Sequence, residues 1–460
     1  MKIPTAPPSY SGLLRDLFQN PERFQEVISA EVGPAPDRKY RHWDILRHLT
    51  PPHGLTHEEW WCAVKFARQH LYQQVPLKDK EGGSFQYAML DLAYQMLHQI
   101  DSDARGVIGG SGPVTNRDTR NTYLFKSIIE EAITSSQLEG ASTTREAAKD
   151  MIQRGRPPRD RSERMILNNY ETMQLIRELK DKPLTPDLLI HIQSLLTKDT
   201  LEDPTATGRF RTAEENICVM DEVGNILHRP PAAEQLERRV QEMCDFANAP
   251  DDTDKWIHPV LRSIVLHFWL GYDHPFVDGN GRTARALFYW SMASRGFWLC
   301  EFISISRIIK NAPAKYSRAF IYTETDDNDL TYFILNQLGV IIRAIGELHE
   351  YLGRKQTELL ETEAMLRKSE ILHDRLNHRQ LALVNHALKH ARVPYTIESH
   401  RTSHRVSYPT ARTDLLRLVE LGLLSQYKRG RAYAFVAPTD FRERLETLQG
   451  MDIPVLTNIA

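Results

Sequence analysis

The stretch "HPFVDGNGRTAR", residues 274–285, brings a histidine, an acid, two glycines around an asparagine and two arginines into one short segment. Apolar residues recur at helical spacing from 257 to 268, and "TARALFYWSMASRGF" at the end of the segment can form a second helix. Gly279, Asn280 and Gly281 can adopt turn geometries with positive φ that bulky residues resist. The sequence therefore predicts a helix, a tight turn and the N-terminus of another helix.

The residue types in this turn are those of a polyphosphate site. Main-chain N–H groups around 279–281 attract anions, because they lie unpaired at the positive end of a helix. Arg282 and Arg285 add forked donors that suit phosphate oxygens. His274, with an ordinary pKa of about 6.5, can accept a proton near neutrality. Asp278 has two interpretations: it neutralises the arginines, or it holds Mg²⁺ together with phosphate oxygens.

Composition excludes some classes of function. The chain of 460 residues is 41% hydrophobic and 26% charged, with a formal net charge of −2, so any nucleic-acid surface has to be local. Its apolar runs are far shorter than the roughly 20 residues of a membrane span. "MKIPTAPPSY" (1–10) lacks the apolar stretch of a signal peptide. The four cysteines are widely spaced and predict buried free thiols (Cys62, Cys218, Cys244 and Cys300). We therefore expect a cytoplasmic protein without membrane contact.

The segment "HPFVDGNGR" (274–282) resembles the Fic-domain signature HPFx(D/E)GN(G/K)R and matches it at every fixed position. The resemblance extends over roughly 120–350. It implies a mainly α fold, a Fic helical bundle with a β-hairpin flap. It also implies an enzyme that transfers AMP from ATP to a Ser, Thr or Tyr hydroxyl of a protein and releases pyrophosphate.

The same resemblance implies roles for the residues of the turn. His274 would deprotonate the target hydroxyl, and Asp278 would bind Mg²⁺ between the α- and β-phosphates. The amides of Gly279 to Gly281, with Asn280, would stabilise charge on the α-phosphate. Arg282 and Arg285 would hold the β- and γ-phosphates. Gly281 favours adenylyl transfer, because the phosphotransferase branch of the family has lysine at that position.

"SSQLEG", residues 135–140, is the second informative stretch. Ser135 and Glu139 are four residues apart, so they share one helix face, and Gly140 predicts the helix end. One interpretation is an ordinary surface glutamate. The resemblance implies the inhibitory helix of the family, (S/T)xxxE(G/N), with Glu139 against Arg285 where the γ-phosphate would bind. The same glutamate could instead position water for removal of AMP, and the sequence leaves this direction open.

The segment "CVMDEVGNILHRPP", residues 218–231, predicts a strand, a turn at Gly224-Asn225 and a second strand. A hairpin with an exposed edge can pair with an extended target segment. By resemblance this is the target-docking flap, and the alternative is a hairpin without a binding role. The predicted docking residues are Val223, Asn225, Ile226 and Leu227.

The C-terminal part changes character. "RLNHRQLALVNHALKH" predicts an amphipathic helix, "YTIESHRTS" and "SYPTARTDLLRLVELGLL" predict a helix-turn-helix, and "SQYKRGRAYAFV" predicts a two-stranded wing. This order resembles a winged helix, with Thr410 to Leu418 in the recognition helix. Residues 379–431 carry ten basic residues against three acids. The basic residues are Arg379, Lys389, Arg392, Arg401, Arg405, Arg412, Arg417, Lys428, Arg429 and Arg431. DNA binding is the preferred interpretation, and protein contact or dimerisation is the alternative.

The predicted domain organisation has four parts: a helical N-terminal region (1–112), the Fic core with inhibitory and connecting helices (113–368), the winged-helix domain (369–440) and a C-terminal tail (441–460). The leading hypothesis is an autoinhibited protein adenylyltransferase that uses ATP and Mg²⁺. The alternatives are a DNA-binding regulator whose Fic domain senses nucleotide, and a de-AMPylase or phosphotransferase variant. Expected partners are ATP and a protein hydroxyl, with DNA and a second copy of the chain as open alternatives.

Overall fold

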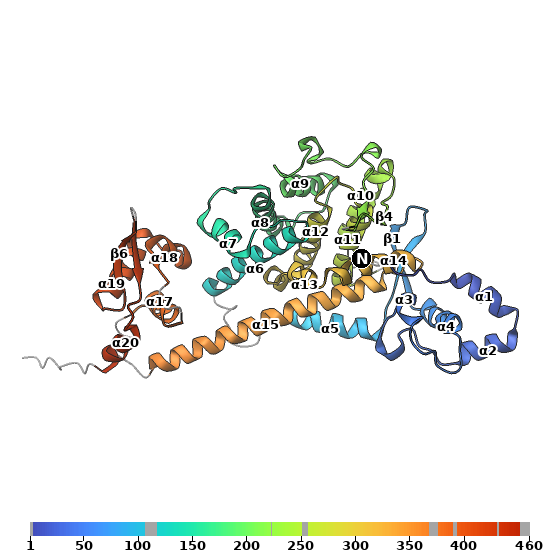
Figure 1. Cartoon of the computed structure of the whole chain (residues 1–460), viewed down its shortest axis with the longest axis horizontal. Helices are drawn as coiled ribbons and strands as arrows, with labels where there is room; N and C mark the ends of the chain where they lie inside the picture. The colour runs from blue at the N-terminus through green and yellow to red at the C-terminus, as the bar shows by residue number, and fades with distance from the viewer. Residues whose placement is uncertain are drawn as a thin grey trace, which may run out of the picture. The chain divides into compact units, whose positions relative to one another are not determined.

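A computed structural model describes most of the chain, and Figure 1 traces it. The described residues are 3–105, 117–221, 223–250, 256–367, 376–389, 393–429 and 432–450. Two compact units are separated, one from Met1–Gly109 and Tyr123–Leu348, the other from Gly110–Thr122 and His349–Ala460. The fold is mainly helical, as predicted. The predicted boundaries at 112 and 368 lie outside the described residues.

The N-terminal part of the first unit contains helices and one hairpin. The helices are α1 (Tyr10–Phe18), α2 (Pro21–Ser29), α3 (Trp43–Leu46), α4 (His57–Gln69) and α5 (Asp91–Arg105), with the 3-10 helix η1 (Pro36–Arg38). Strands β1 (Tyr72–Lys78) and β2 (Ser84–Ala88) pair antiparallel. The N-terminal region was predicted as helical, and this hairpin between its helices was not foreseen. Val75 and Leu77 alternate with exposed residues along β1, and Gly82, with φ +93°, turns the chain.

Helices dominate the chain from 117 to 367, which belongs to the first unit except for its two ends, 117–122 and 349–367. They are α6 (Arg117–Leu138), α7 (Arg145–Arg154), α8 (Arg161–Leu179), α9 (Pro186–Thr197), α10 (Leu236–Asn248), α11 (Pro259–Asp273), α12 (Asn280–Ser294), α13 (Ile305–Lys310), α14 (Pro313–Thr325) and the long α15 (Thr331–Arg367). Short 3-10 helices are η2 (Pro204–Ala206), η3 (Ala213–Glu215), η4 (Ala233–Gln235) and η5 (Trp298–Phe302). One small hairpin joins β3 (Val219–Met220) to β4 (Ile226–His228).

Helices α11 and α12 form the centre of this unit. Nearly every residue of both helices is buried, which is typical of a helix enclosed by others. Ser263 Oγ donates to Ser291 Oγ at 2.8 Å and ties the two helices together. Because α11 ends at Asp273 and α12 begins at Asn280, the predicted helix, turn and helix N-terminus are confirmed.

The second unit has its own core. Its elements are α17 (His378–Lys389), β5 (Tyr395–Thr396), α18 (Ile397–His404), α19 (Tyr408–Glu420), β6 (Ser425–Arg429), β7 (Ala432–Val436) and α20 (Phe441–Gly450). The strands form one antiparallel sheet in the order β5-β7-β6. This is the predicted order of helices and strands, while membership of the winged-helix class stays a prediction. Helix α20 covers the first half of the predicted tail, and its Phe441 and Leu445 pack into the core.

Two further expectations meet the structure here. Cys62, Cys244 and Cys300 are buried free thiols as predicted, whereas Cys218 is only half-buried, because it lies just before the exposed β3–β4 hairpin. Within the described ranges, every helix is too short or too polar to cross a bilayer.

Candidate active site

The backbone of the turn explains its glycine and its histidine. His274 ends α11 in the left-handed conformation (φ 44°), and its N–H donates to Leu270 O at 3.0 Å. Gly279, also left-handed at φ 84°, begins α12. A Cβ on Gly279 would lie 2.8 Å from Thr197 Cγ2, so both backbone conformation and space require glycine. The turn therefore directs the first amides of α12 into one region.

Asn280 has a task that the sequence interpretation missed. Its side chain is buried, its Oδ1 accepts from Phe276 N at 3.0 Å, and its Nδ2 donates to Phe276 O at 2.7 Å. Both ends of the amide are therefore used to close the turn. The side chain is therefore not available for the expected contact with an α-phosphate, and the group left for that prediction is the main-chain N–H of Asn280 in the first turn of α12.

The His274 ring is half-buried and held by the main chain. Its Nδ1 lies 3.3 Å from Gly271 O, a contact in which Nδ1 donates. Burial lowers the pKa of His274 to about 4, so the ring is neutral at physiological pH. Nε2 is then the nitrogen that can accept a proton. The geometry agrees with a general base.

Arg211, which the sequence analysis did not select, supports this histidine from the hairpin side. Its Nε donates to His274 O at 2.8 Å and its Nη2 donates to Pro231 O at 2.5 Å. The guanidinium thereby ties the end of α11 to the chain that leaves the β3–β4 hairpin. In the sequence it is one of two arginines in "GRFR" (208–211), and nothing nearby distinguishes it, because its partners lie 20 or more residues further along the chain.

Asp278 is accessible at the edge of the turn. Its side chain is 36% exposed, and its Oδ1 accepts from Gly279 N at 2.5 Å. Arg161 Nη2 and Arg282 Nη2 lie 3.6 and 3.7 Å from its carboxylate, too far for hydrogen bonds. Among the described residues no three acids, histidines or cysteines group as a metal site. One open carboxylate suits Mg²⁺, which takes its other ligands from phosphate and water.

Arg282 carries unsatisfied donors. Its side chain is fully buried, and Nη1 donates to Leu196 O at 2.8 Å. Nε and Nη2 have no hydrogen-bond partner within the described part of the chain. Burial lowers the pKa of Arg282, which reflects the cost of a charge placed out of water. Unpaired buried donors are rare and costly, and a bound anion would satisfy them.

Arg285 meets the predicted inhibitory motif. Its Nε donates to Ser135 Oγ at 2.8 Å, and its Nη2 donates to Ser135 O at 3.0 Å and to Glu139 Oε1 at 2.8 Å. Burial alone would raise the pKa of Glu139, but the Arg285 charge outweighs it and the pKa lies below its ordinary value. The predicted approach of Glu139 to Arg285 is therefore present.

Glu139 also lies over the first turn of α12. A Cβ on Gly281 would meet Glu139 Oε1 at 2.2 Å and Arg285 Nη1 at 3.2 Å. The carboxylate thus occupies space directly above a helix N-terminus, where an anion is favoured. Glycine at 281 is what allows this approach.

The hairpin predicted as a flap is present and exposed. Asp221 N donates to Asn225 O at 2.9 Å, and Asp221 Oδ1 accepts from Val223 N and Asn225 N. Val223 is 77% exposed, Ile226 and Asn225 are exposed, and Leu227 is half-buried. The predicted hairpin is confirmed, while its docking role stays a prediction.

His228, at the end of β4, holds the hairpin to the core. Its Nδ1 lies 2.7 Å from Glu324 Oε2 and its Nε2 lies 2.7 Å from Tyr272 O. Since Tyr272 lies on α11 just before His274, the hairpin and the turn share one support. A histidine directly after the predicted docking residues was the only signal for it in the sequence.

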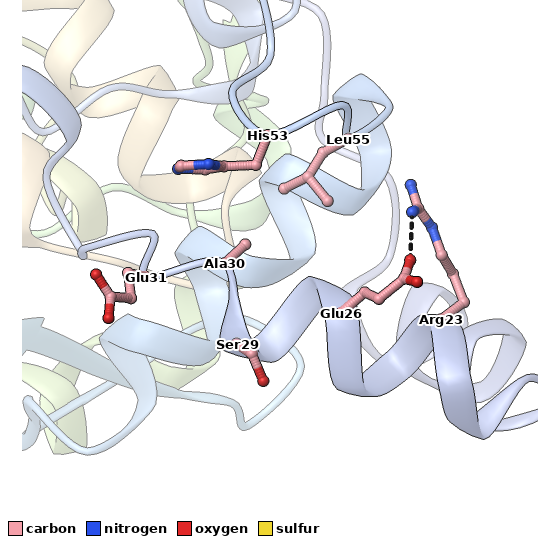
Figure 2. Close-up of a pocket in the computed structure, with 7 residues that line it drawn as sticks. All are labelled: Arg23, Glu26, Ser29, Ala30, Glu31, His53 and Leu55. Carbon is pink, nitrogen blue, oxygen red and sulfur yellow. Dashed lines mark hydrogen bonds and ion pairs between the residues drawn. The ribbon is translucent and has the colours of Figure 1, made fainter.

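A cavity elsewhere carries none of this chemistry. Figure 2 shows a shallow cavity of about 300 Å³ in the N-terminal part of the chain. Its lining includes an Arg23–Glu26 ion pair of 2.7 Å and no residue of the turn. The remaining lining residues are Ser29, Ala30, Glu31, His53 and Leu55.

The second unit offers fewer free basic groups than the sequence suggests. Three of the arginines are in ion pairs: Arg379 with buried Asp414, Arg401 with Glu398, and Arg417 with Glu420. Arg405, Arg412 and Lys428 are exposed. Arg392 and Arg431 lie outside the described residues, as do the side chains of Lys389 and Arg429. Arg379 stabilises the fold, because its partner is buried, and is a poor candidate for phosphate contact.

Comparisons with known proteins find a family match, related sequences and a similar solved structure. Residues 183–292 match the model of the Fic/DOC family. The chain is 28% identical over 248 residues to "Protein adenylyltransferase Fic" of Nematostella vectensis, covering 50% of this chain and 53% of that protein. It is 27% identical over 184 residues to "Protein adenylyltransferase fic-1" of Caenorhabditis elegans, covering 39% and 34%. A solved Fic family protein from Desulfovibrio desulfuricans G20 aligns with a TM-score of 0.49 and 17% identity, over 77% of this chain and 98% of that chain.

The chain therefore spans about half the length of the first relative and about a third of the second. The predicted Fic domain is confirmed for the matched residues. These include the turn and the hairpin. Ser135 and Glu139 lie upstream of the match, so the inhibitory motif rests on geometry and resemblance.

Proposed function

We propose that this chain is an autoinhibited protein adenylyltransferase, which moves AMP from ATP to a hydroxyl group of a target protein or of itself. The observation that carries the proposal is the set of groups at the turn. A neutral His274, the unpaired amides of α12 and the unsatisfied N–H groups of Arg282 all belong to one segment. The two curated relatives are named for the same transfer.

The reaction follows from these groups. His274 Nε2 accepts the proton of the target hydroxyl, and the hydroxyl oxygen attacks the α-phosphorus. The bond from the α-phosphorus to the bridging oxygen of the β-phosphate breaks, and pyrophosphate leaves. Arg282 and the α12 amides stabilise the phosphate charge, and each charge-assisted hydrogen bond contributes about 1.5–3 kcal/mol. Catalysis of this kind depends mainly on positioning and electrostatics.

Asp278 is the residue that would hold Mg²⁺. The ion would be bound jointly with phosphate oxygens and would reduce the charge on the departing pyrophosphate. Arg161, 3.6 Å from the same carboxylate, would then be free to face the outer phosphates. No other acidic residue is needed in this proposal.

Autoinhibition would act through the Arg285 guanidinium. Glu139 and Ser135 use its Nε and Nη2, which are the groups that would otherwise receive the γ-phosphate. A carboxylate over the first turn of α12 also takes the place of a phosphate. The same glutamate could direct water for removal of AMP, so the direction of the reaction needs a test.

The exposed hairpin would present the target. Its outer edge can pair with an extended segment through main-chain hydrogen bonds, and Val223 and Ile226 would add apolar contacts. Because such pairing reads little sequence, it suits targets that share only an exposed hydroxyl.

The test uses the full chain, ATP and Mg²⁺, with intact mass as the readout. Glu139→Gly should gain AMP where the wild-type chain gains little, and Glu139→Gly with His274→Ala should gain none. Addition of phosphate alone would indicate a phosphotransferase. Loss of AMP from a previously modified chain would indicate a de-AMPylase. No change in any variant, with ATP uptake absent by calorimetry, would support a role in nucleotide-independent regulation and end the proposal.

A second candidate function, DNA binding, is favoured by helix α19. Tyr408, Arg412 and Thr413 are exposed on this helix, and Arg405 is exposed just before it. In a helix-turn-helix this helix would enter the major groove. The full chain should bind duplex DNA with an affinity that falls as salt rises, and Arg412→Ala should weaken it. Dimerisation by light scattering without DNA binding would favour the protein-contact alternative.

A further inference from the structure

Helix α6 carries three polar residues on one face. Glu131, Ser135 and Glu139 follow one another at intervals of four residues, so their side chains align along the helix. Ser135 and Glu139 contact Arg285. Glu131 belongs neither to the turn nor to the inhibitory motif, and the proposed reaction does not use it.

Glu131 is nevertheless one of the most completely bound carboxylates of the unit. Only 2% of the residue is exposed. Its Oε2 accepts from Tyr289 Oη at 2.9 Å, Ser304 Oγ at 2.7 Å and Ser306 N at 3.1 Å. Its Oε1 accepts from Ser306 Oγ. All four donors are neutral, and together they satisfy a buried charge that would otherwise be costly.

These donors are themselves fixed in place. Tyr289 Oη accepts from Ile305 N at 2.9 Å, and Ser304 caps α13 by accepting from Arg307 N at 3.2 Å. Two elements, α12 and the start of α13, therefore hold the carboxylate from different sides. We call this group of four donors around Glu131 the α6 clasp: Tyr289, Ser304 and the main-chain and side-chain donors of Ser306.

The clasp and the inhibitory contact use the same two helices. Glu131 of α6 bonds Tyr289 of α12. Four residues later on α6, Ser135 bonds Arg285, which lies four residues earlier on α12. The two helices are thus held in antiparallel register at two successive turns. A slip or tilt of α6 at Glu131 would be transmitted to Ser135 and Glu139.

Glu139 depends on such support. It follows the last residue of α6, where the helix dipole disfavours a negative charge, and its side chain is 27% exposed. Among the described residues its side chain has one hydrogen-bond partner, the Arg285 guanidinium at 2.8 Å. Its position over α12 therefore needs the helix to be anchored further upstream.

We infer that Glu131 is the positioning residue of the inhibitory helix, and that the α6 clasp sets how firmly Glu139 occupies the nucleotide site. This inference rests on the proposed function. It assigns regulation to a carboxylate that contacts neither nucleotide nor target. Weakening the clasp should release Glu139 and activate the enzyme, whereas general damage to a buried network should reduce activity.

The experiment combines auto-AMPylation with hydrogen exchange on the full chain. Glu131→Gln places an amide N–H₂ group among donors, and should raise AMP incorporation about tenfold or more, since one lost charge-assisted hydrogen bond shifts an equilibrium by that factor. Amides of 132–138 should exchange faster than in the wild-type chain. Combining the substitution with Glu139→Gly should give no further rise, because both act on one contact.

Two matched variants separate the clasp from lost stability. Tyr289→Phe removes one donor and keeps the ring, so it should activate more weakly than Glu131→Gln and remains informative if that variant does not fold. Asp326→Asn alters another carboxylate of the same burial, bound to Lys65 Nζ and Tyr332 Oη at 2.7 Å and touching neither α6 nor α12. It should not activate, because none of the bonds of Asp326 in the described residues reaches α6 or α12.

The outcomes are distinguishable. If Glu139→Gly itself incorporates no AMP, the proposed function fails, and hydrogen exchange of 132–138 alone judges the clasp. An active Glu139→Gly beside Glu131→Gln and Tyr289→Phe variants at wild-type activity and exchange would overturn the inference. Faster exchange with lower activity would overturn it as well, because the clasp would then serve catalysis rather than restraint.

Discussion

The turn at 274–285 and the β3–β4 hairpin belong to the same proposed site but differ in how firmly their residues are held. In the turn, Asn280 and His274 have their backbone or side-chain groups tied to neighbours, and Arg282 is fully buried. The hairpin instead exposes Val223 and Ile226 and is held to the core at His228. The groups proposed to act on ATP, whose covalent structure is always the same, are preorganised. Groups proposed to meet variable targets are left open.

The comparison predicts the largest effect at His274. His274→Asn in the Glu139→Gly background should lower kcat/KM by about 10²–10⁴-fold, because a general base is lost while asparagine still tolerates the left-handed backbone. Initial rates with labelled ATP measure this. Calorimetry should find ATP binding largely retained, and retained transfer would remove His274 from the role of base.

Gly281→Ala should have the next largest effect, and it should activate only where Glu139 is present. In the wild-type chain the new methyl group meets Glu139 Oε1 at 2.2 Å, so it should displace the glutamate and raise AMP incorporation up to about tenfold. In the Glu139→Gly background that clash is absent and the rate should not rise. Inactivity in both backgrounds would show that the methyl group blocks phosphate instead.

A smaller effect concerns pH. His274 must be neutral to act as a base, and burial lowers its pKa to about 4, so kcat/KM should stay nearly constant as pH falls from 7.5 to about 5.5. A histidine with the ordinary pKa of about 6.5 would lose about tenfold over that range. The pH profile of Glu139→Gly decides between them. Removing Glu139 lowers the pKa of His274 further, so the flat profile is also the expected result in this background.

The smallest effects belong to the hairpin. Val223→Ser should change the free energy of unfolding by less than about 0.5 kcal/mol, because the side chain is largely exposed. ATP affinity measured by calorimetry should not change either. Ile226→Ser should likewise leave stability and ATP affinity nearly unchanged. Met220→Ser is the matched control, because Met220 is an exposed apolar residue on the paired strand β3 that is not among the predicted docking residues. A fall in ATP affinity would break the proposed separation between chemistry and target docking.

The sequence predicted the turn well for a physical reason. Its histidine, acid, glycines and arginines are contiguous, and each residue type has few alternative uses in that order. The contact between Glu139 and Arg285, separated by 146 residues, came from resemblance and not from spacing. The helices before and after this segment, α11 and α12, were predicted from periodicity.

What the sequence could not predict are partners that meet only in the folded chain. Arg211, His228 and Glu131 are ordinary residues until their distant partners are known. The side-chain amide of Asn280 was expected at phosphate, but it closes the turn. The β1–β2 hairpin was missed because helical periodicity dominates its surroundings.

Composition also overestimated the number of free basic side chains in the second unit. A count of basic residues treats every arginine as free, yet Arg379 lies 2.6 Å from a carboxylate of buried Asp414. Ion pairs between residues that are far apart in the chain are invisible to such a count. Within the described part of the second unit, Arg405, Arg412 and Lys428 are the exposed basic residues left for a nucleic-acid interpretation.

The carboxylate above Gly281 has one more consequence. If Glu139 and a nucleotide compete for the same helix end, the glutamate is an intramolecular competitor. Its effective concentration is set by its attachment to the chain and not by the cell. Such a rival is outcompeted by mass action. The basal activity of the autoinhibited enzyme would then rise with the ATP concentration around it, without any separate regulatory site.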